Sequence, residues 1–434
     1  MKIAPEIRAL TAEAEAALAD IFRDIDEIAR AHTEHVLDCF REAEVSESLF
    51  TPSTGYGYGD RGRDTIDELA AAVFRAESGF MRPSLLSGTH TLTVALFGIL
   101  RPGDTMLCCT GMPYDTLLDV IGIGSAQSRG SVSTEGSLRD WGVSFEKVDL
   151  QNGTIDLDGL KQAMAAYRPK MVYCQRSKGY ENRPALSVRE IRHAAWVVRQ
   201  TADELGIPRP VFMVDNCYGE FVEASEPCRS DDLRADEAAA DLMAGSLIKN
   251  PGGGMADIGG YIVGRAECVR LCGNRLTSPG VGLDVGASLG QNRNLIKGLF
   301  YAPHTVAQAM KTAHLAAYLF EKLGLVVAPD WRTRRADIVQ IIECGTADGL
   351  VAFCRGIQAA SPIDAHVVPY PAEMPGYADP VVMAAGAFTG GASIELSADG
   401  PLRPPYAAYM QGGLTYESGR LAVMSAANEL CMKK

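Results

Sequence analysis

Short apolar runs alternate with amphipathic segments over the first half of the chain, and this alternation most restricts the possible folds. Apolar runs of strand length stand at residues 105–109, 143–148, 171–174 and 211–215. Segments with apolar side chains at helical spacing stand at residues 157–167 and 188–205. Strands that alternate with helices predict an α/β fold, in which a mostly parallel sheet has helices on both faces.

Polar residues at the ends of these strands predict where a ligand binds. In open α/β sheets, ligands bind beyond the carboxyl ends of the strands. Asp215 ends the last apolar run, Tyr114 follows the first run after a turn, and Gln175 comes directly after the third. We expect these three side chains to lie near one another, although Asp215 alone could instead cap the turn that follows it.

The length of 434 residues predicts more than one domain. Residues 1–55 read as a helical arm, with one helix from about residue 5 to 45. Residues 56–310 form the expected large domain. Residues 311–434 predict a smaller α+β domain that begins within a helix at 305–323 and includes short strands at 351–354 and 392–396.

Composition excludes several classes of function. The formal net charge of −13, with no basic run, argues against a nucleic-acid or anionic-membrane partner. Eleven cysteines include no C-x-x-C pair, so neither a zinc site nor a disulfide framework is expected. The amino terminus lacks the apolar core of a signal peptide, and no apolar stretch is long enough for a membrane span. We therefore expect a cytoplasmic protein without a metal site.

Lys249 is the residue best placed for covalent chemistry. It stands within residues 244–260, between an apolar run and three glycines, Gly252, Gly253 and Gly254. Apolar neighbours lower the pKa of an amine, which favours formation of a Schiff base. The glycines would let the backbone approach a bulky ligand. A lone lysine before a turn is more often a solvated charge, so this interpretation depends on the rest of the chain.

Two other segments suit a phosphate. Ser87, Gly88 and Thr89 precede an apolar helical run, and the free N–H groups of a helix's first turn attract anions. Residues 54–63 interleave tyrosines and arginines with glycines, and phenol and guanidinium groups suit phosphate oxygens. An ordinary helix cap and a solvated turn are the alternatives. Asp64 is expected to cap the helix that follows.

One cofactor needs these features together: pyridoxal 5′-phosphate. Its aldehyde would condense with Lys249, and its phosphate needs N–H donors and cations. Its pyridine nitrogen must stay protonated to accept electrons, which a carboxylate such as Asp215 ensures. Tyr114 offers an aromatic face for the ring. Lys249, Asp215 and Tyr114 are therefore the predicted catalytic residues.

A series of ordered blocks also resembles a known family. The blocks are residues 55–64, 87–90 (Ser-Gly-Thr-His), 110–116, 175–180, 214–222 (Val-Asp-Asn-Cys-Tyr-Gly-Glu-Phe-Val), 246–254 and 394–403. Together they resemble the aluminium-resistance or methionine γ-lyase-like group of fold-type I pyridoxal phosphate enzymes, which is related to the cystathionine β- and γ-lyases. The resemblance runs from about residue 56 to 416. It implies the fold-type I architecture, with a seven-stranded sheet in the large domain.

The resemblance implies how the cofactor is held. Lys249 would bind the cofactor and later move protons, Asp215 would pair with the pyridine nitrogen, and Tyr114 would stack on the ring. The phosphate would lie against the segment Ser87, Gly88 and Thr89 and against the Ser246 hydroxyl.

In the wider lyase family, a neighbouring subunit adds a tyrosine and an arginine to the phosphate site. Tyr58 fits that tyrosine, whereas Arg61 is offset by one position, so Arg63 remains a rival for the arginine. The implied assembly is a homodimer or homotetramer with shared active sites.

Four residues are candidates for contact with the substrate. Arg403 is the implied partner of the substrate carboxylate, with Arg420 as the alternative. Gln175 and Arg176 stand where the better-studied lyases have a Pro- and Asn-rich stretch, and they are expected to influence substrate choice. The implied reaction is β- or γ-elimination of a sulfur-containing amino acid by a carbon–sulfur lyase. Another reaction on the same scaffold (γ-replacement, decarboxylation, racemisation or aminotransfer) and a non-catalytic pyridoxal phosphate protein are the alternatives.

Overall fold

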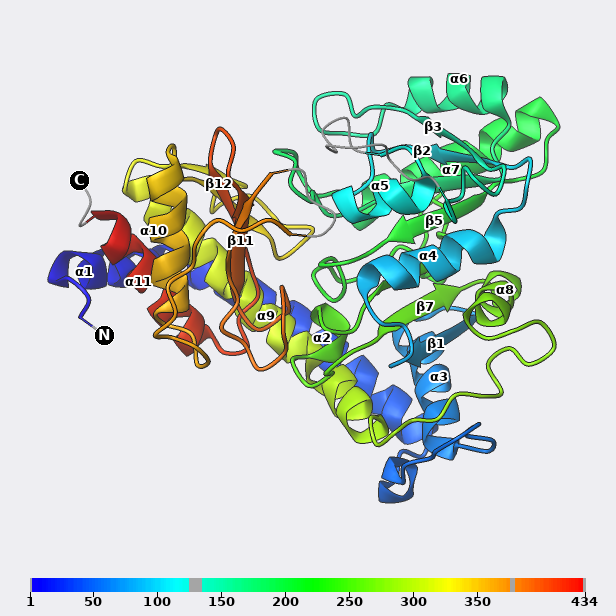
Figure 1. Cartoon of the computed structure of the whole chain (residues 1–434), viewed down its shortest axis with the longest axis horizontal. Coiled ribbons are helices and arrows are strands. Elements are labelled where there is room, and N and C mark those ends of the chain that lie inside the picture. The colour runs from blue at the N-terminus through cyan, green and yellow to red at the C-terminus, as the bar shows by residue number, and fades with distance from the viewer. Residues whose placement is uncertain (1, 125–134, 375–378, 432–434) are drawn as a thin grey trace.

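The computed structural model describes residues 2–124, 135–374 and 379–431. Its larger sheet has seven strands in the order β1-β7-β6-β5-β4-β2-β3 (Figure 1). Strand β7 runs antiparallel to both of its neighbours, and the other strand pairs are parallel. The strands are β1 Ser78–Arg82, β2 Thr105–Cys108, β3 Ser144–Lys147, β4 Met171–Gln175, β5 Val211–Asp215, β6 Leu242–Ser246 and β7 Gly260–Gly264. The expected mostly parallel, seven-stranded sheet is confirmed.

Helices cover both faces of this sheet. Three of them, α4 Gly88–Ile99, α5 Asp115–Ile121 and α8 Ala266–Leu276, pack on one face. The opposite face carries α3 Arg61–Phe74, α6 Leu157–Tyr167, α7 Val188–Leu205 and part of α9 Asn292–Lys322. In β5, Val211 and Met213 contact the first set, whereas Phe212 and Val214 contact the second. The strand is apolar without interruption because both of its faces are buried.

A second sheet lies in the C-terminal part of the chain, on the left of Figure 1. Its five strands are antiparallel, in the order β10-β11-β12-β9-β8. They are β8 Val326–Ala328, β9 Gln340–Glu343, β10 Val381–Ala384, β11 Ser397–Pro401 and β12 Ala407–Gln411, packed against α10 Ala347–Gln358 and α11 Tyr416–Cys431.

Two expected strands in this part are wrong. Residues 351–354 belong to α10, which begins at the Thr346 side-chain cap. Residues 392–396 form a loop rather than a strand, and the Ile394 N–H donates to the carbonyl oxygen of Ile248, beside Lys249. A short apolar run does not distinguish a strand from one face of a buried helix or from a loop.

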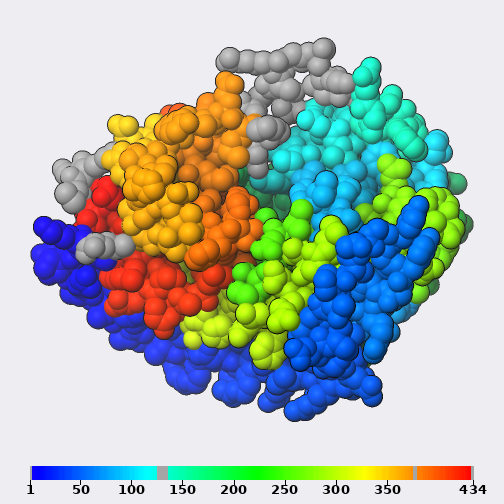
Figure 2. All heavy atoms as spheres, turned by 60° about the horizontal axis from the view of Figure 1, so that its bottom comes forward, coloured from blue at the N-terminus to red at the C-terminus, as the bar shows by residue number. Residues whose placement is uncertain are grey.

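The amino-terminal segment connects the two sheets. The single helix expected near residues 5–45 is two helices, α1 Pro5–Ala17 and α2 Ala19–Glu42, interrupted at Leu18 and followed by the 3₁₀ turn η1 Glu47–Phe50. Helix α1 joins the core of the second sheet, whereas α2 packs along α9. Figure 2 shows these blue helices along one edge of the molecule, beneath both halves.

Asp60, rather than the expected Asp64, caps α3, because its side chain accepts a hydrogen bond from the Arg63 N–H.

Among the helices of the described chain, none is long and apolar enough to cross a membrane.

Candidate active site

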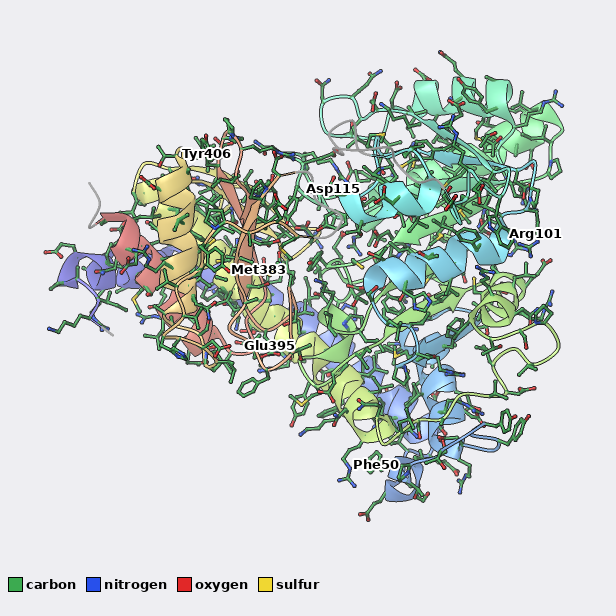
Figure 3. All side chains as sticks on the ribbon, in the orientation of Figure 1. Phe50, Arg101, Asp115, Met383, Glu395 and Tyr406 are labelled. Atoms are coloured by element: carbon green, nitrogen blue, oxygen red, sulfur yellow. The ribbon has the colours of Figure 1, made fainter. Side chains whose placement is uncertain are left out.

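A cavity of about 370 Å³ lies at the carboxyl ends of β4, β5 and β6, between the larger sheet and the C-terminal sheet. In Figure 3, Asp115 at the start of α5 and Met383 on β10 mark the two halves of the molecule on either side of it. Most of the predicted site residues line this cavity: Ser87, Gly88, Thr89, Tyr114, Gln175, Asp215, Ser246 and Lys249.

Lys249 follows β6 and reaches into the cavity. Its Nζ donates to the Tyr218 hydroxyl at 2.6 Å and to the carbonyl oxygen of Ala392. Burial lowers the pKa of Lys249, although the negative charges of Asp399 and Glu220 act in the opposite direction. A lowered pKa favours the neutral amine, which is the nucleophilic form. The side chain of Lys249 is therefore held by polar contacts inside the cavity, in a setting that favours its neutral form, rather than being a solvated surface charge.

The three glycines after Lys249 serve packing, not ligand approach. None of them lines the cavity. A Cβ atom at Gly252 would lie 1.7 Å from the Leu247 carbonyl oxygen, and one at Gly253 would lie 2.3 Å from the Gly298 carbonyl oxygen in α9. The expectation that they admit a bulky ligand is wrong, because Gly253 instead lets the chain after the short 3₁₀ turn η2 (Asn250–Gly252) approach α9, and a Cβ atom at Gly254 would meet the Leu414 side chain.

Asp215 ends β5 at the bottom of the cavity and is 6% exposed. One of its carboxylate oxygens accepts from the Cys217 N–H at 3.1 Å, and the other accepts from the Tyr173 hydroxyl at 3.2 Å. Burial raises the pKa of Asp215, and these hydrogen bonds oppose the rise. A buried carboxylate without an ion-pair partner suits a ligand that brings a positive charge.

The start of α4 forms an anion-binding wall. Ser87 caps the helix by accepting from the His90 N–H at 3.1 Å. The N–H groups of Gly88 and Thr89, in the first turn, have no acceptor within the helix and lie at the cavity. A Cβ atom at Gly88 would lie only 3.4 Å from the Cβ of Ser246, so glycine lets the helix start approach β6. These donors suit a phosphate, and Lys249 is the one lysine or arginine among the described residues that line the cavity.

Tyr114 and Gln175 form another side of the cavity. The Tyr114 N–H donates to the Gln175 side-chain oxygen at 2.7 Å, and the Gln175 amide donates to the Ser177 carbonyl oxygen at 3.0 Å. The Tyr114 ring centre lies 5.9 Å from that of Tyr180. These contacts fix an aromatic ring at the cavity edge, and Gln175 holds the Tyr114 backbone.

Arg176 does not line the cavity, so the structure gives no support to its expected contact with substrate. Its guanidinium is fully buried, donates to Asn216 at 2.8 Å and forms an ion pair with Glu223 at 2.8 Å. Successive residues of an extended chain point to opposite sides. Because Gln175 faces the cavity, Arg176 faces the interior behind β5, where it holds the Asn216 loop.

The loop that carries Tyr58 and Arg61 lies on the surface and does not line the cavity of its own chain. Tyr58 is 72% exposed and stacks on Tyr56, with ring centres 5.5 Å apart. Arg63, the rival to Arg61, is 4% exposed and donates to the carbonyl oxygens of Gly57 and Gly286. These intrachain contacts favour Arg61 over Arg63 as the arginine offered to another subunit, and the choice between them stays a prediction.

Neither candidate arginine for the substrate carboxylate lines the cavity. Arg403 follows β11 and pairs with Asp379 at 2.8 Å. Arg420, in α11, pairs with Glu15 of α1 at 2.7 Å and so joins the two ends of the chain.

Several cavity residues were not predicted from the sequence: Cys217, Tyr218, Asp399, Tyr409 and Gln411. Cys217 and Tyr218 stand two and three residues after Asp215, so their position in the strand-end turn is a signal that could have identified them. Asp399 and Tyr409 come from β11 and β12, and only the packing of the second sheet brings them to the cavity. Within the described residues, no group of three or more His, Cys, Asp or Glu side chains could hold a metal ion.

Comparisons with known proteins match nearly the whole chain. A family model described as methionine gamma-lyase matches residues 7–431. The uncharacterized protein YnbB of Bacillus subtilis is 48% identical over 423 residues, 97% of this chain and 96% of that protein. The solved structure of a carbon-sulfur lyase involved in aluminum resistance from Clostridium novyi is 41% identical, with a TM-score of 0.88 over 98% of this chain and 96% of that chain.

A more distant solved structure supports the fold alone. Cystathionine gamma synthase from Xanthomonas oryzae shares 14% identity, with a TM-score of 0.56 over 94% of this chain and 99% of that chain. The architecture is that of the fold-type I enzymes, and the chain belongs to the methionine gamma-lyase family.

Proposed function

We propose that this protein is a pyridoxal 5′-phosphate-dependent carbon–sulfur lyase that acts on a sulfur-containing amino acid by β- or γ-elimination. The observation that best supports the proposal is that Lys249, Asp215 and the start of α4 line the same cavity. Family membership supports the reaction class, because the Clostridium novyi neighbour is described as a carbon-sulfur lyase.

The residues present fit the cofactor. The cavity of about 370 Å³ has the size of a small-molecule site. The Gly88 and Thr89 N–H groups and the Ser246 hydroxyl would hold the phosphate. Asp215 would keep a proton on the pyridine nitrogen, and Tyr114 would lie against the ring. When bound, the cofactor supplies an electron sink for the α-carbon of the substrate.

Lys249 would serve first as the point of covalent attachment and then as the base. Tyr218 accepts a hydrogen bond from Nζ at 2.6 Å, and the Ala392 carbonyl accepts a second, so the direction of the amine is fixed. The pKa of Lys249 is lowered by burial, which favours the neutral amine that takes a proton from the substrate α-carbon.

We also propose that a second copy of the chain completes the phosphate site with Tyr58 and Arg61. The anion-binding wall holds N–H donors but no cation among its described residues, although a phosphate carries nearly two negative charges. Tyr58 is largely exposed, and Arg61 also lies at the surface. A basic side chain from a symmetry-related copy would supply the missing charge.

The test is turnover by the cofactor-loaded protein. Cysteine, cystathionine, methionine and homocysteine are supplied in turn, and keto acid, ammonia and thiol are measured. Pyruvate identifies β-elimination, and 2-oxobutyrate from a substrate whose sulfur is on Cγ identifies γ-elimination. The Lys249→Ala variant should release neither. The lyase proposal is wrong if no sulfur amino acid yields a keto acid while the cofactor is bound.

A further inference from the structure

Tyr218 contacts the amine that is proposed as the base. Its hydroxyl oxygen lies 2.6 Å from Lys249 Nζ, and Nζ lies 4.6 Å from the centre of the Tyr218 ring. Both side chains line the cavity. The other acceptor of Nζ is the Ala392 carbonyl oxygen, which carries no proton. Of these two contacts, only Tyr218 can both accept a proton from the amine and donate one.

The backbone of Tyr218 adopts a conformation that costs free energy. Its φ is +71°, in the left-handed region that residues other than glycine rarely adopt. The Tyr218 carbonyl oxygen accepts from the Ile338 N–H at 3.2 Å, and the side chain packs against the small apolar cluster that includes Val339. Such conformations persist where surrounding contacts impose them, and they gather at functional sites. The turn after β5 is thus held in the form that brings Tyr218 to Lys249.

Three other tyrosines are among the described residues that line the cavity. The Tyr180 hydroxyl donates to Asp399, and the Tyr409 hydroxyl donates to the Tyr180 carbonyl oxygen at 2.7 Å. These two protons are engaged in holding the cavity wall. The third is Tyr114, which is assigned to stack on the cofactor ring and is the rival to Tyr218 as a proton donor.

An elimination that breaks a carbon–sulfur bond moves two protons. Lys249 takes the first from the α-carbon and becomes an ammonium. The sulfur departs with the electron pair of the broken bond, and as a thiolate it is a strong base. A proton supplied while that bond breaks promotes its departure. The reaction therefore needs an acid at the leaving group and a way to return Lys249 to its neutral form.

We propose that Tyr218 is the general acid that protonates the departing sulfur, an assignment that rests on the proposed lyase function. The Tyr218 O–H gives its proton to the sulfur as the carbon–sulfur bond breaks. The Tyr218 oxygen then takes a proton from the Lys249 ammonium through the contact between them. The substrate loses one proton from its α-carbon and the thiol gains one, and both side chains regain their starting protonation states.

A leaving group that needs no proton tests the assignment. Acetate departs as a stable anion, whereas an alkanethiolate needs a proton. For elimination at Cβ the pair is O-acetyl-L-serine and S-ethyl-L-cysteine, and for Cγ it is O-acetyl-L-homoserine and L-methionine. In Tyr218→Phe, kcat/KM for keto acid release from the thioether should fall roughly 100-fold or more. That from the acetate ester should fall about tenfold or less, because only a hydrogen bond to Lys249 is lost.

Two variants make the same chemical change elsewhere. Tyr318→Phe removes a hydroxyl on α9 that donates to Glu13 and does not line the cavity, so the ratio of the two substrates should stay that of the wild type. Tyr114→Phe keeps an aromatic face for the cofactor and should also keep the ratio. If the loss confined to the thioether appears in Tyr114→Phe and not in Tyr218→Phe, Tyr114 is the acid and the inference is wrong.

The contact with Lys249 is checked without turnover. Because the Tyr218 oxygen accepts from Nζ, its removal destabilises the ammonium, and the pKa of Lys249 should be lower in Tyr218→Phe than in the wild type. Competitive acetylation of the cofactor-free chain over a range of pH, quantified on the Lys249 peptide by mass spectrometry, measures that pKa. Tyr318→Phe should leave it unchanged. An unchanged profile in Tyr218→Phe would contradict the contact.

Exchange of the α-proton separates the acid from the base. L-alanine has no leaving group, so the loss of its α-hydrogen in D₂O, followed by NMR, reports Lys249 without the acid. Tyr218→Phe should keep this exchange within about tenfold of the wild-type rate. If the variant slows exchange and both eliminations equally, Tyr218 only positions Lys249 and the inference is wrong.

The outcomes distinguish the two proposals. If the wild-type protein releases keto acid from the thioether and Tyr218→Phe leaves the substrate ratio unchanged, the Tyr218 assignment alone fails. If the wild-type protein exchanges the α-proton of L-alanine but releases keto acid from no thioether, the lyase proposal fails, and the Tyr218 assignment fails with it.

Discussion

Asp215 illustrates how the surroundings of one residue suit it to a ligand. Its carboxylate is buried at the end of β5, and burial raises its pKa, yet two hydrogen bonds keep both oxygens directed. A protonated pyridine nitrogen would reverse the rise in pKa, because an adjacent positive charge stabilises the carboxylate.

Replacing this carboxylate by an amide tests that role. In Asp215→Asn the pyridine nitrogen loses the group that keeps it protonated, so kcat for keto acid release should fall by roughly 100-fold or more. Tyr173→Phe removes only one hydrogen bond to the same carboxylate and should cost about tenfold or less. Steady-state kinetics of both variants are compared, and equal activity of Asp215→Asn and wild type would contradict the assignment.

At the scale of residues, the sequence identifies those site residues whose local structure is determined by their neighbours in the chain. Lys249 follows an apolar strand, Asp215 ends one, and Ser87 precedes a helix, so the sequence alone indicates that each of them lies at the site. Asp399 could not be, because its position depends on how the second sheet packs against the first. Arg176 also follows a strand end but does not line the cavity, because successive side chains of an extended chain point to opposite sides.

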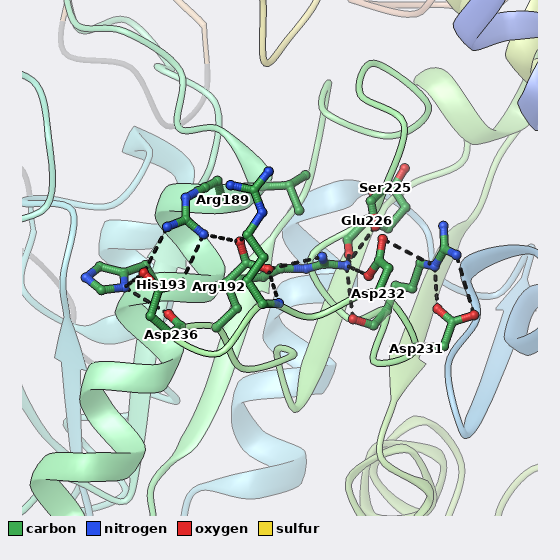
Figure 4. A network of polar contacts seen from close by, with 12 residues as sticks. Arg189, Arg192, His193, Ser225, Glu226, Asp231, Asp232 and Asp236 are labelled. Atoms are coloured by element: carbon green, nitrogen blue, oxygen red, sulfur yellow. Dashed lines mark hydrogen bonds and ion pairs between the residues drawn. The ribbon is translucent and has the colours of Figure 1, made fainter.

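At the scale of elements, an arginine network fixes helix α7 to the loop after β5 (Figure 4). Arg192 is 3% exposed and donates to the Ser225 hydroxyl at 2.7 Å and to the Glu226 carbonyl oxygen at 2.8 Å. It also forms an ion pair with Asp232 at 2.8 Å. Arg189, one turn earlier on the same helix, is 44% exposed in its side chain. The loop also positions the Glu226 carboxylate, which accepts a hydrogen bond from the residue next to Asp215.

The buried and the exposed arginine should therefore differ in their effect on stability. Arg192→Ala leaves buried acceptors without donors and should lower the free energy of unfolding by about 2–5 kcal/mol. Arg189→Ala, a control from the same network, should lower the free energy of unfolding far less, because its ion pairs face solvent on one side. Urea unfolding of the two variants gives the comparison. If both variants lose the same free energy of unfolding, burial does not determine how strongly these contacts stabilise the fold.

Two helices with strong end signals, α6 and α7, match the predicted ranges to the residue. Helix α6 begins at the Asp156 cap, and α7 begins at a capping box formed by Ser187 and Glu190. Residues 351–354 were misread because their apolar run alone fits both a strand and a buried helix. The Thr346 cap upstream was the deciding signal.

At the scale of the whole molecule, one buried histidine should make the fold sensitive to acid. His314 in α9 is 3% exposed, and burial lowers its pKa to about 3 from an ordinary value of 6.5. Between these two pH values the unfolded chain binds the proton and the folded chain does not, so stability falls as the pH falls. His314→Asn should flatten this dependence by up to about 1.4 kcal/mol per pH unit. Denaturant unfolding at pH 7 and pH 5 measures the change, and an unaltered slope would contradict it.

Mixing two inactive variants tests whether active sites are shared between copies. Lys249→Ala and Arg61→Ala chains are each expected to be severely impaired. After unfolding and refolding together, about half of the dimers are mixed, and each has one intact site, so about a quarter of wild-type activity should return. Each variant, unfolded and refolded without the other, provides the control. Absence of recovery, with mixed dimers demonstrated, would place Arg61 outside the partner's site.

The division of the chain near residue 310 stays a prediction. The mostly parallel sheet follows from the periodicity of the sequence, and its seven strands follow from the family resemblance. The contribution of α1 to the C-terminal core could not be predicted, because it depends on contacts between chain ends more than 400 residues apart, such as that of Arg420 with Glu15.

The central claim is that Lys249 carries the cofactor. The protein loaded with pyridoxal 5′-phosphate is reduced with borohydride and digested, and its peptides are weighed and sequenced by mass spectrometry. The account predicts one stable pyridoxyl phosphate adduct, located on Lys249 and absent from the Lys249→Ala variant. An unmodified Lys249, or an adduct located on another lysine, would contradict it.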